Sequence, residues 1–167
     1  MFNFDVFFKK FRRGEIYFDN FPSDKQLLFK NKTLPLLHES IEKKDEDLLS
    51  STLAVLFYDG ADIDYTEDLL KLLKVDWHIL EEDIIQVLEI IKDPKSIETL
   101  YELALFVPDY DEMRSLAKKC LYALSAINTK ESIEKIKILS TFDDDIIREN
   151  ALMILSASSP DGPSMSE

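Results

Sequence analysis

Apolar residues recur every three or four positions along most of this chain, and that spacing places them on one face of an α-helix. Two such stripes lie within residues 33–58, on either side of a charged run from Glu42 to Asp47, and predict a helical hairpin. A further helix is predicted to begin at Thr66, and a longer one to end before Pro94, since the residue before a proline disfavours helical geometry. The pattern therefore predicts an all-α protein.

The chain repeats itself from residue 93 onward. The tripeptide Ser-Ile-Glu at residues 96–98 recurs at residues 132–134. A second pattern, Asp-x-x-Arg-x-x-Ala followed by an apolar pair, begins at Asp111 and again at Asp145. The two patterns together form a repeat unit of two helices, and each helix is apolar on only one stripe. Neighbouring units must therefore stack to bury these stripes.

The Asp-x-x-Arg-x-x-Ala pattern resembles the second helix of a short bacterial HEAT repeat, although a repeat of about 35 residues is shorter than the usual HEAT length of about 40–47. The resemblance implies an α-solenoid of antiparallel helical hairpins, one domain over residues 1–156 that is clearest in residues 93–156. It also implies a ladder of ion pairs between adjacent repeats, with Ala117 and Ala151 allowing close helix packing. The ladder positions are Asp111, Arg114, Asp145 and Arg148. We expect Arg148 to reach Asp111 or Asp145 and so to bridge the last two repeats.

The first 32 residues are rich in phenylalanine and carry a basic cluster. The aromatic stripe comprises Phe4, Phe7, Phe8 and Phe11, and the cluster comprises Lys9, Lys10, Arg12 and Arg13. A basic amphipathic helix can lie on a membrane surface. A helix of about three turns with this much aromatic surface favours instead a cap over residues 1–32, packed as a lid on the first helices.

Composition removes several other classes of protein. With only 3 Gly, the sequence lacks the turn residues of a β-sandwich or barrel. Cys120 is the single cysteine, so an intramolecular disulfide is excluded. The apolar runs are too short to span a bilayer, and we expect a cytoplasmic protein without stable membrane association. Residues 157–167 are rich in Ser and Pro and are predicted to form a disordered tail.

Charge is distributed unevenly along the chain, whose net charge is −13. Residues 1–32 carry seven Lys/Arg against four Asp/Glu, whereas residues 33–167 carry thirteen against twenty-nine. So acidic a body repels phosphate backbones, which disfavours direct nucleic-acid binding and favours a basic protein as partner. The alternative, that acidity only keeps the protein in solution, stays open.

No catalytic or metal site is predicted. His38, on an apolar stripe, is interpreted as a core or capping residue, and His78 as a packing residue beside Trp77. An EF-hand loop starting at Asp62 fails, because it would need Gly where Glu67 stands and Glu where Leu73 stands. No glycine-rich phosphate loop is present, and we expect no cofactor and no small-molecule substrate.

Acidic residues mixed with aromatic residues, in the predicted connections between helices, are the candidates for partner binding, since aromatic anchors among acids suit an interface with a cationic protein. The candidates are Tyr58, Asp59, Asp62, Asp64, Tyr65, Trp77, His78, Asp109, Tyr110, Asp111 and Glu112. In the connection before residue 145, Asp143 or Asp144 is instead predicted to cap the following helix.

A longer block, which runs from residue 77 through the segments 93–105 and 109–124 to residue 152, resembles small bacterial HEAT-like immunity proteins of toxin systems. That resemblance implies a non-catalytic module that binds and neutralises a basic toxin such as a nuclease. Two alternatives remain open. One is a helical-repeat enzyme or cofactor-attachment factor similar to the phycobilin lyases, and the other is a general scaffold.

Overall fold

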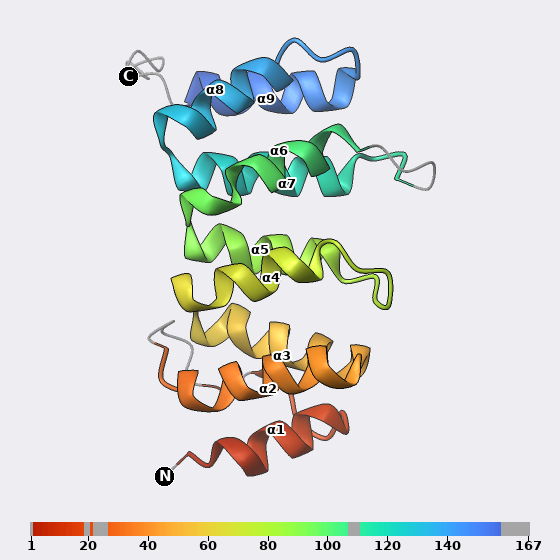
Figure 1. The fold of residues 1–167 in the computed structure, drawn as a ribbon, viewed down its shortest axis with the longest axis vertical. Helices are drawn as coiled ribbons and strands as arrows, with labels where there is room; N and C mark the ends of the chain where they lie inside the picture. The colour runs from red at the N-terminus through yellow and green to blue at the C-terminus, as the bar shows by residue number, and fades with distance from the viewer. Residues whose placement is uncertain (1, 19–20, 22–26, 107–110, 158–167) are drawn as a thin grey trace, which may run out of the picture. The chain divides into compact units, whose positions relative to one another are not determined.

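The computed structural model describes residues 2–18, 21, 27–106 and 111–157. All regular elements in these ranges are α- or 3-10 helices, which confirms the predicted all-α class (Figure 1). The helices cluster in two compact units, Met1–Ile91 and Lys92–Glu167. The single domain over residues 1–156 stays a prediction.

The first unit begins with the helix that carries the aromatic stripe and continues with the predicted hairpin. Its elements are α1 (Phe4–Arg12), α2 (Lys30–Lys43), α3 (Glu46–Asp59), the 3-10 helix η2 (Ile63–Tyr65), α4 (Thr66–Leu72) and α5 (Glu81–Ile91). Between α2 and α3 the chain reverses through Lys44, which has a left-handed φ of 50°. The carboxylate of Asp45 then accepts the amide of Leu48 at 2.8 Å and caps α3.

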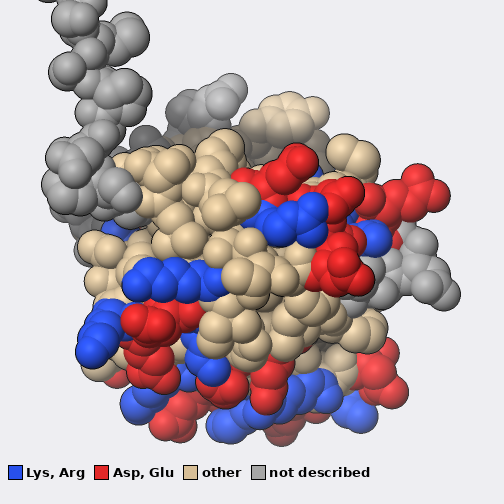
Figure 2. Space-filling view, turned by 90° about the horizontal axis from the view of Figure 1, so that it is seen from above, with Lys and Arg blue, Asp and Glu red and all other residues tan. Residues whose placement is uncertain are grey.

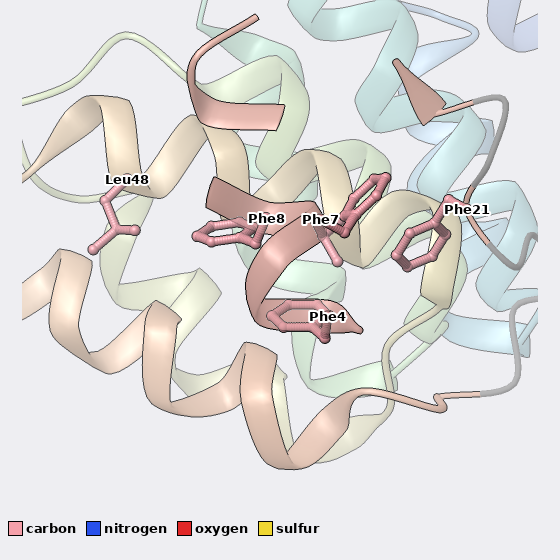
Figure 3. Close-up of a cluster of buried hydrophobic side chains, with 6 residues drawn as sticks. Phe4, Phe7, Phe8, Phe21 and Leu48 are labelled. Carbon is pink, nitrogen blue, oxygen red and sulfur yellow. The ribbon is translucent and has the colours of Figure 1, made fainter. Parts of the chain in front are cut away.

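The aromatic stripe of α1 packs inward. Phe4, Phe7 and Phe8 are buried together with Phe21 and with Leu48 and Val55 of α3 (Figure 3). Two ion pairs hold the ends of α1: Lys32–Asp5 at 3.0 Å and Arg12–Asp45 at 3.9 Å. The stripe is therefore part of the core of this unit. That residues 1–32 form a cap stays a prediction.

The second unit contains the two repeats. Its elements are η3 (Pro94–Ser96), α6 (Ile97–Leu105), α7 (Ser115–Ile127), α8 (Lys130–Leu139) and α9 (Asp145–Ala157). The hairpins α6–α7 and α8–α9 lie against each other, with α7 in contact with both α8 and α9 (Figure 1). Ala117 of α7 and Ala151 of α9, which are equivalent in the repeat, are both buried. The two copies of the pattern therefore share a buried alanine, whereas Phe106, another apolar position of the predicted repeat, is 59% exposed.

The predicted ladder is found only in part, because Arg148 reaches Asp145 as predicted while the link between the two hairpins comes from another pair. Arg114 does not lie inside a helix but precedes α7 with a left-handed φ of 54°, whereas Arg148 lies within α9. Arg114 Nε donates to Asp144 Oδ2 at 2.7 Å, and this ion pair links the two hairpins. Arg148 does pair with Asp145, but within its own helix, and donates to the Phe142 carbonyl at 3.0 Å.

The reason for the shift is that α9 begins at Asp145, whereas α7 begins four residues after Asp111. The Asp111 carboxylate instead accepts the amides of Ser115 at 2.8 Å and Leu116 at 3.1 Å. Asp144 caps α9 by accepting the amide of Ile147 at 3.1 Å, which confirms its predicted capping role. Of the predicted tail, Ala157 is the last residue of α9, and residues 158–167 lie outside the described residues.

Candidate functional site

Asp59, at the C-terminal end of α3, is fully buried. Its carboxylate accepts the amide of Leu28 at 2.9 Å and that of Phe29 at 3.0 Å, and its carbonyl accepts the amide of Leu27 at 2.8 Å. These amides precede α2 and have no acceptor within that helix. The prediction that Asp59 contacts a partner is therefore corrected, since its carboxylate holds the start of α2 against the end of α3.

Asp62 and Asp64, further along the α3–α4 connection, share one cation. Lys30 Nζ lies 2.6 Å from Asp62 Oδ2 and is also hydrogen-bonded to Asp64. The hydrogen bonds from Asp62 and then Asp64 raise the pKa of Lys30 above its ordinary value, so the ammonium stays charged. Both carboxylates reach the surface, with 36% and 58% of their side chains exposed, but part of their charge is neutralised within the molecule.

The two tyrosines that flank this connection both contact other side chains of the first unit. Tyr65 is fully buried, and its hydroxyl lies 2.8 Å from that of Thr33. Burial raises the pKa of Tyr65 above its ordinary value. Tyr58 stacks on Phe18 with ring centroids 4.1 Å apart and is 36% exposed at the surface. The prediction that Tyr65 anchors a partner is therefore wrong, because Tyr65 is a core residue. In Tyr58, one face of the ring is covered by Phe18.

His78 fixes the loop between α4 and α5 from the inside and is 3% exposed. Its Nδ1 accepts the amide of Leu80 at 3.1 Å, so this nitrogen carries no proton. The proton is then on Nε2, which donates to the Leu72 carbonyl at 3.1 Å. Trp77 stands edge-on to the imidazole, with ring centroids 4.8 Å apart. The prediction of a packing role for His78 agrees with this geometry, and its candidacy as a contact residue is withdrawn because it is buried.

The outer side of this loop combines exposed apolar and acidic side chains, and the loop extends beyond the helix ends in Figure 1. Ile79 is 84% exposed and Val75 is 38% exposed. The acids Asp76, Glu82 and Asp83 are exposed as well. We refer to residues 74–83 as the α4–α5 corner.

Two acids of the corner carry free charge. Within the described ranges, neither Asp76 nor Asp83 has an ion-pair partner. Elsewhere acids and bases pair frequently, and Figure 2 shows Lys/Arg and Asp/Glu side chains next to one another on the face seen from above. Sequence reasoning found Trp77 here but missed Ile79 and Val75. One feature of the sequence could have indicated them, since both apolar residues lie between two predicted helices and belong to the apolar stripe of neither.

The third predicted cluster, in the α6–α7 connection, is only partly described. Asp109 and Tyr110 lie outside the described residues. Asp111 is engaged at the start of α7, as set out above, and Glu112 is exposed. The structure therefore does not bring together a complete acidic and aromatic surface from the described part of this cluster.

Other candidate chemistry is accounted for by internal contacts. His38 is exposed rather than in the core, which corrects its prediction, and its Nε2 lies 2.9 Å from Asp68 Oδ2. Cys120 is buried, and desolvation raises the pKa of its thiol, which suppresses the reactive thiolate. No group of three or more His, Cys, Asp or Glu side chains that could hold a metal ion occurs among the described residues.

A groove of about 1000 Å³ lies between α1, α2 and α3. Basic residues line it, but three of them are matched by acids of the same groove, in the pairs Lys32–Asp5, Arg12–Asp45 and Lys43–Glu39. Its lining therefore offers no concentrated positive charge for an anionic ligand.

No protein-family model, curated protein or solved structure matches this chain. Among the described residues, no helix is both long and apolar enough to cross a membrane.

Proposed function

We propose that this chain is a non-catalytic protein-binding module that takes a basic protein partner at the α4–α5 corner. The observation that carries the proposal is the pairing of exposed Ile79 with unneutralised Asp76 and Asp83 on a loop held by a buried histidine. Exposed apolar surface beside acids suits a partner that supplies apolar contact and cationic side chains. The net charge of −13 adds long-range attraction for such a partner.

In its most concrete form, the module is an immunity-type protein that neutralises a basic toxin such as a nuclease in the cytoplasm. This form rests on the resemblance of the segments between residues 77 and 152 to small HEAT-like immunity proteins. We also infer that the hairpins are HEAT-like repeats, an inference supported by the stacking of α6–α7 on α8–α9 and by the buried Ala117 and Ala151. A rigid repeat scaffold suits a role in which the protein occupies a surface of its partner.

The test is affinity capture from the source cells at about 50 mM salt, a concentration at which charge attraction is only weakly screened. The bait is compared with the double variant Asp76→Lys, Asp83→Lys and with a control of equal charge change, Glu42→Lys, Glu46→Lys. We expect a protein of basic composition to be captured by the bait and the control but lost from the corner variant. Retention by the corner variant, or capture of an acidic protein whose binding is insensitive to salt, would refute the proposal.

The toxin form of the proposal needs a second measurement. The captured protein is expressed in a heterologous host with and without this chain. We expect the captured protein alone to arrest growth of the host, and co-expression of this chain to restore growth. If the captured protein alone does not affect growth, only the general binding function remains.

A further inference from the structure

The α4–α5 corner holds an apolar side chain in a defined position. Ile79 lies between His78, which is anchored to the Leu72 carbonyl, and Leu80, whose amide is bonded to the imidazole. Its backbone is thus tied on both sides while 84% of the residue remains exposed. A contact residue that is ordered before binding loses less conformational entropy when a partner arrives.

The surroundings of Ile79 indicate what can cover it. Val75, which is 38% exposed, is a second apolar residue of the same loop, and the exposed carboxylates of Asp76 and Asp83 lie in this loop and in the first turn of α5. An acidic or purely apolar segment would leave these carboxylates repelled or desolvated. A segment with cations alone would leave Ile79 uncovered.

We propose that the corner recognises a basic segment with an apolar centre: one or two aliphatic side chains cover Ile79 and Val75 while flanking Lys or Arg side chains reach Asp76 and Asp83. In this arrangement His78 is a positioning residue that keeps the loop in its binding shape. The inference deepens the proposed function and rests on it, because it names the chemistry that the partner presents.

Electrostatic attraction alone would not single out the corner. Glu42 and Asp47, near the α2–α3 turn, are also exposed acids without an ion-pair partner among the described residues, yet no exposed large apolar residue lies in that turn. If charge decided recognition, these acids would serve as well as those of the corner. The presence of Ile79 is what separates the two places.

The chain supplies its own reporter, since Trp77 is the single tryptophan and lies in the corner. The emission of Trp77 is followed in the full chain during titration with two ten-residue peptides of equal positive charge. Both consist of Lys and Arg around two central residues, which are leucines in one peptide and glycines in the other. An acidic peptide with central leucines is the control and is expected not to bind.

We expect the leucine peptide to bind about 5–10-fold more tightly than the glycine peptide, the size of effect that partial burial of two aliphatic side chains provides. Ile79→Ser should abolish this preference, and Asp76→Asn with Asp83→Asn should weaken both peptides alike. Equal affinity for the two cationic peptides would overturn the inference and leave the proposed function standing. Absence of binding by either peptide would overturn both.

The role of His78 is tested with a matched pair of variants. His78→Gln keeps a donor and an acceptor, whereas His78→Leu keeps volume and removes both. We expect hydrogen exchange of the Leu80 amide to accelerate at least tenfold in the leucine variant, together with loss of the peptide preference, and both properties to recover in the glutamine variant. If His78→Leu changes neither the exchange rate of the Leu80 amide nor the preference for the leucine peptide, His78 does not position the loop.

Discussion

The α3–α4 connection and the α4–α5 corner look alike in sequence, since each mixes acids with aromatic residues, but the structure uses their acids in opposite ways. In the first, Asp59 is buried against backbone amides, and Asp62 and Asp64 share Lys30. In the corner, Asp76 and Asp83 are exposed without a cation among the described residues. Similar acidic sequences therefore give carboxylates with internal partners in one connection and free surface charge in the other.

The difference follows from which side chain satisfies the buried polar groups of each connection. Before α2, the amides of Leu28 and Phe29 need an acceptor, and Asp59 supplies it. In the corner, the amide of Leu80 also needs an acceptor, and the His78 imidazole supplies it. Because the His78 imidazole accepts this amide, no carboxylate of the corner is needed as its acceptor, and Asp76 and Asp83 remain exposed.

The largest expected effect is on the buried carboxylate. Asp59→Ala leaves the partly buried amides of Leu28 and Phe29 without their acceptor and should lower the free energy of unfolding by about 2–4 kcal/mol. Urea denaturation followed by circular dichroism measures this loss. Asp64→Asn, at an exposed carboxylate of the same connection, is the control and should change the midpoint little. Similar midpoints for the two variants would show that the two acids are not used differently.

The next effect concerns the acid that links the hairpins of the second unit. Burial acts to raise the pKa of Asp144, but the hydrogen bond from Arg114 and the amides of Ile147 and Ile146 outweigh it and hold the pKa below its ordinary value. Arg114→Met should therefore cost about 1–2 kcal/mol at neutral pH, because it leaves a half-buried carboxylate without its cation.

The sign of the pH dependence follows from the lowered pKa. The contribution of Asp144 is fully present above the pKa of the unfolded chain, about 4, and is lost as pH falls through the lower pKa of the folded state. Asp144→Asn should thus be less stable than the natural chain at pH 7 and approach it near pH 2. A stability difference that stays constant over this range would show that Asp144 does not titrate as described.

The sequence predicted the core better than the surface, for a physical reason. Burial repeats with the helix period, so the hairpin at residues 33–58 and the equivalent Ala117 and Ala151 could be recognised from spacing alone. Whether Asp59 faces inward depends on amides about thirty residues earlier in the chain, and no local pattern records that contact.

The ion pair that links the two hairpins could not be predicted from the repeat, for a related reason. The repeat aligned Arg114 with Arg148, but the chain before α7 adopts a left-handed turn at Arg114 that moves this side chain onto Asp144. Loop geometry of this kind varies between repeats while the core is kept. Ile79 was missed because a single apolar residue in a loop contributes nothing to a helical stripe.

Charge reversal separates the two connections in binding rather than in folding. We expect Asp76→Lys with Asp83→Lys to slow association of the basic partner about tenfold at about 50 mM salt, and Asp62→Lys with Asp64→Lys to slow it less, since Lys30 already offsets the second pair. Stopped-flow or surface-plasmon measurements over a salt series distinguish the two. Equal slowing would mean that net charge alone, and not the corner, steers the partner.

The smallest expected effect is on stability at the centre of the corner. Ile79 is 84% exposed and makes little contact within the fold, so Ile79→Ser should leave the free energy of unfolding within about 0.5 kcal/mol of the natural chain. The same change is expected to abolish the preference for an apolar centre in the bound segment. Leu72, a buried residue of α4 next to this loop, provides the contrast, because Leu72→Ala should destabilise the fold by about 2–4 kcal/mol. If Ile79→Ser also unfolds the chain, Ile79 packs within the molecule, and the corner differs from the α3–α4 connection less than its exposure indicates.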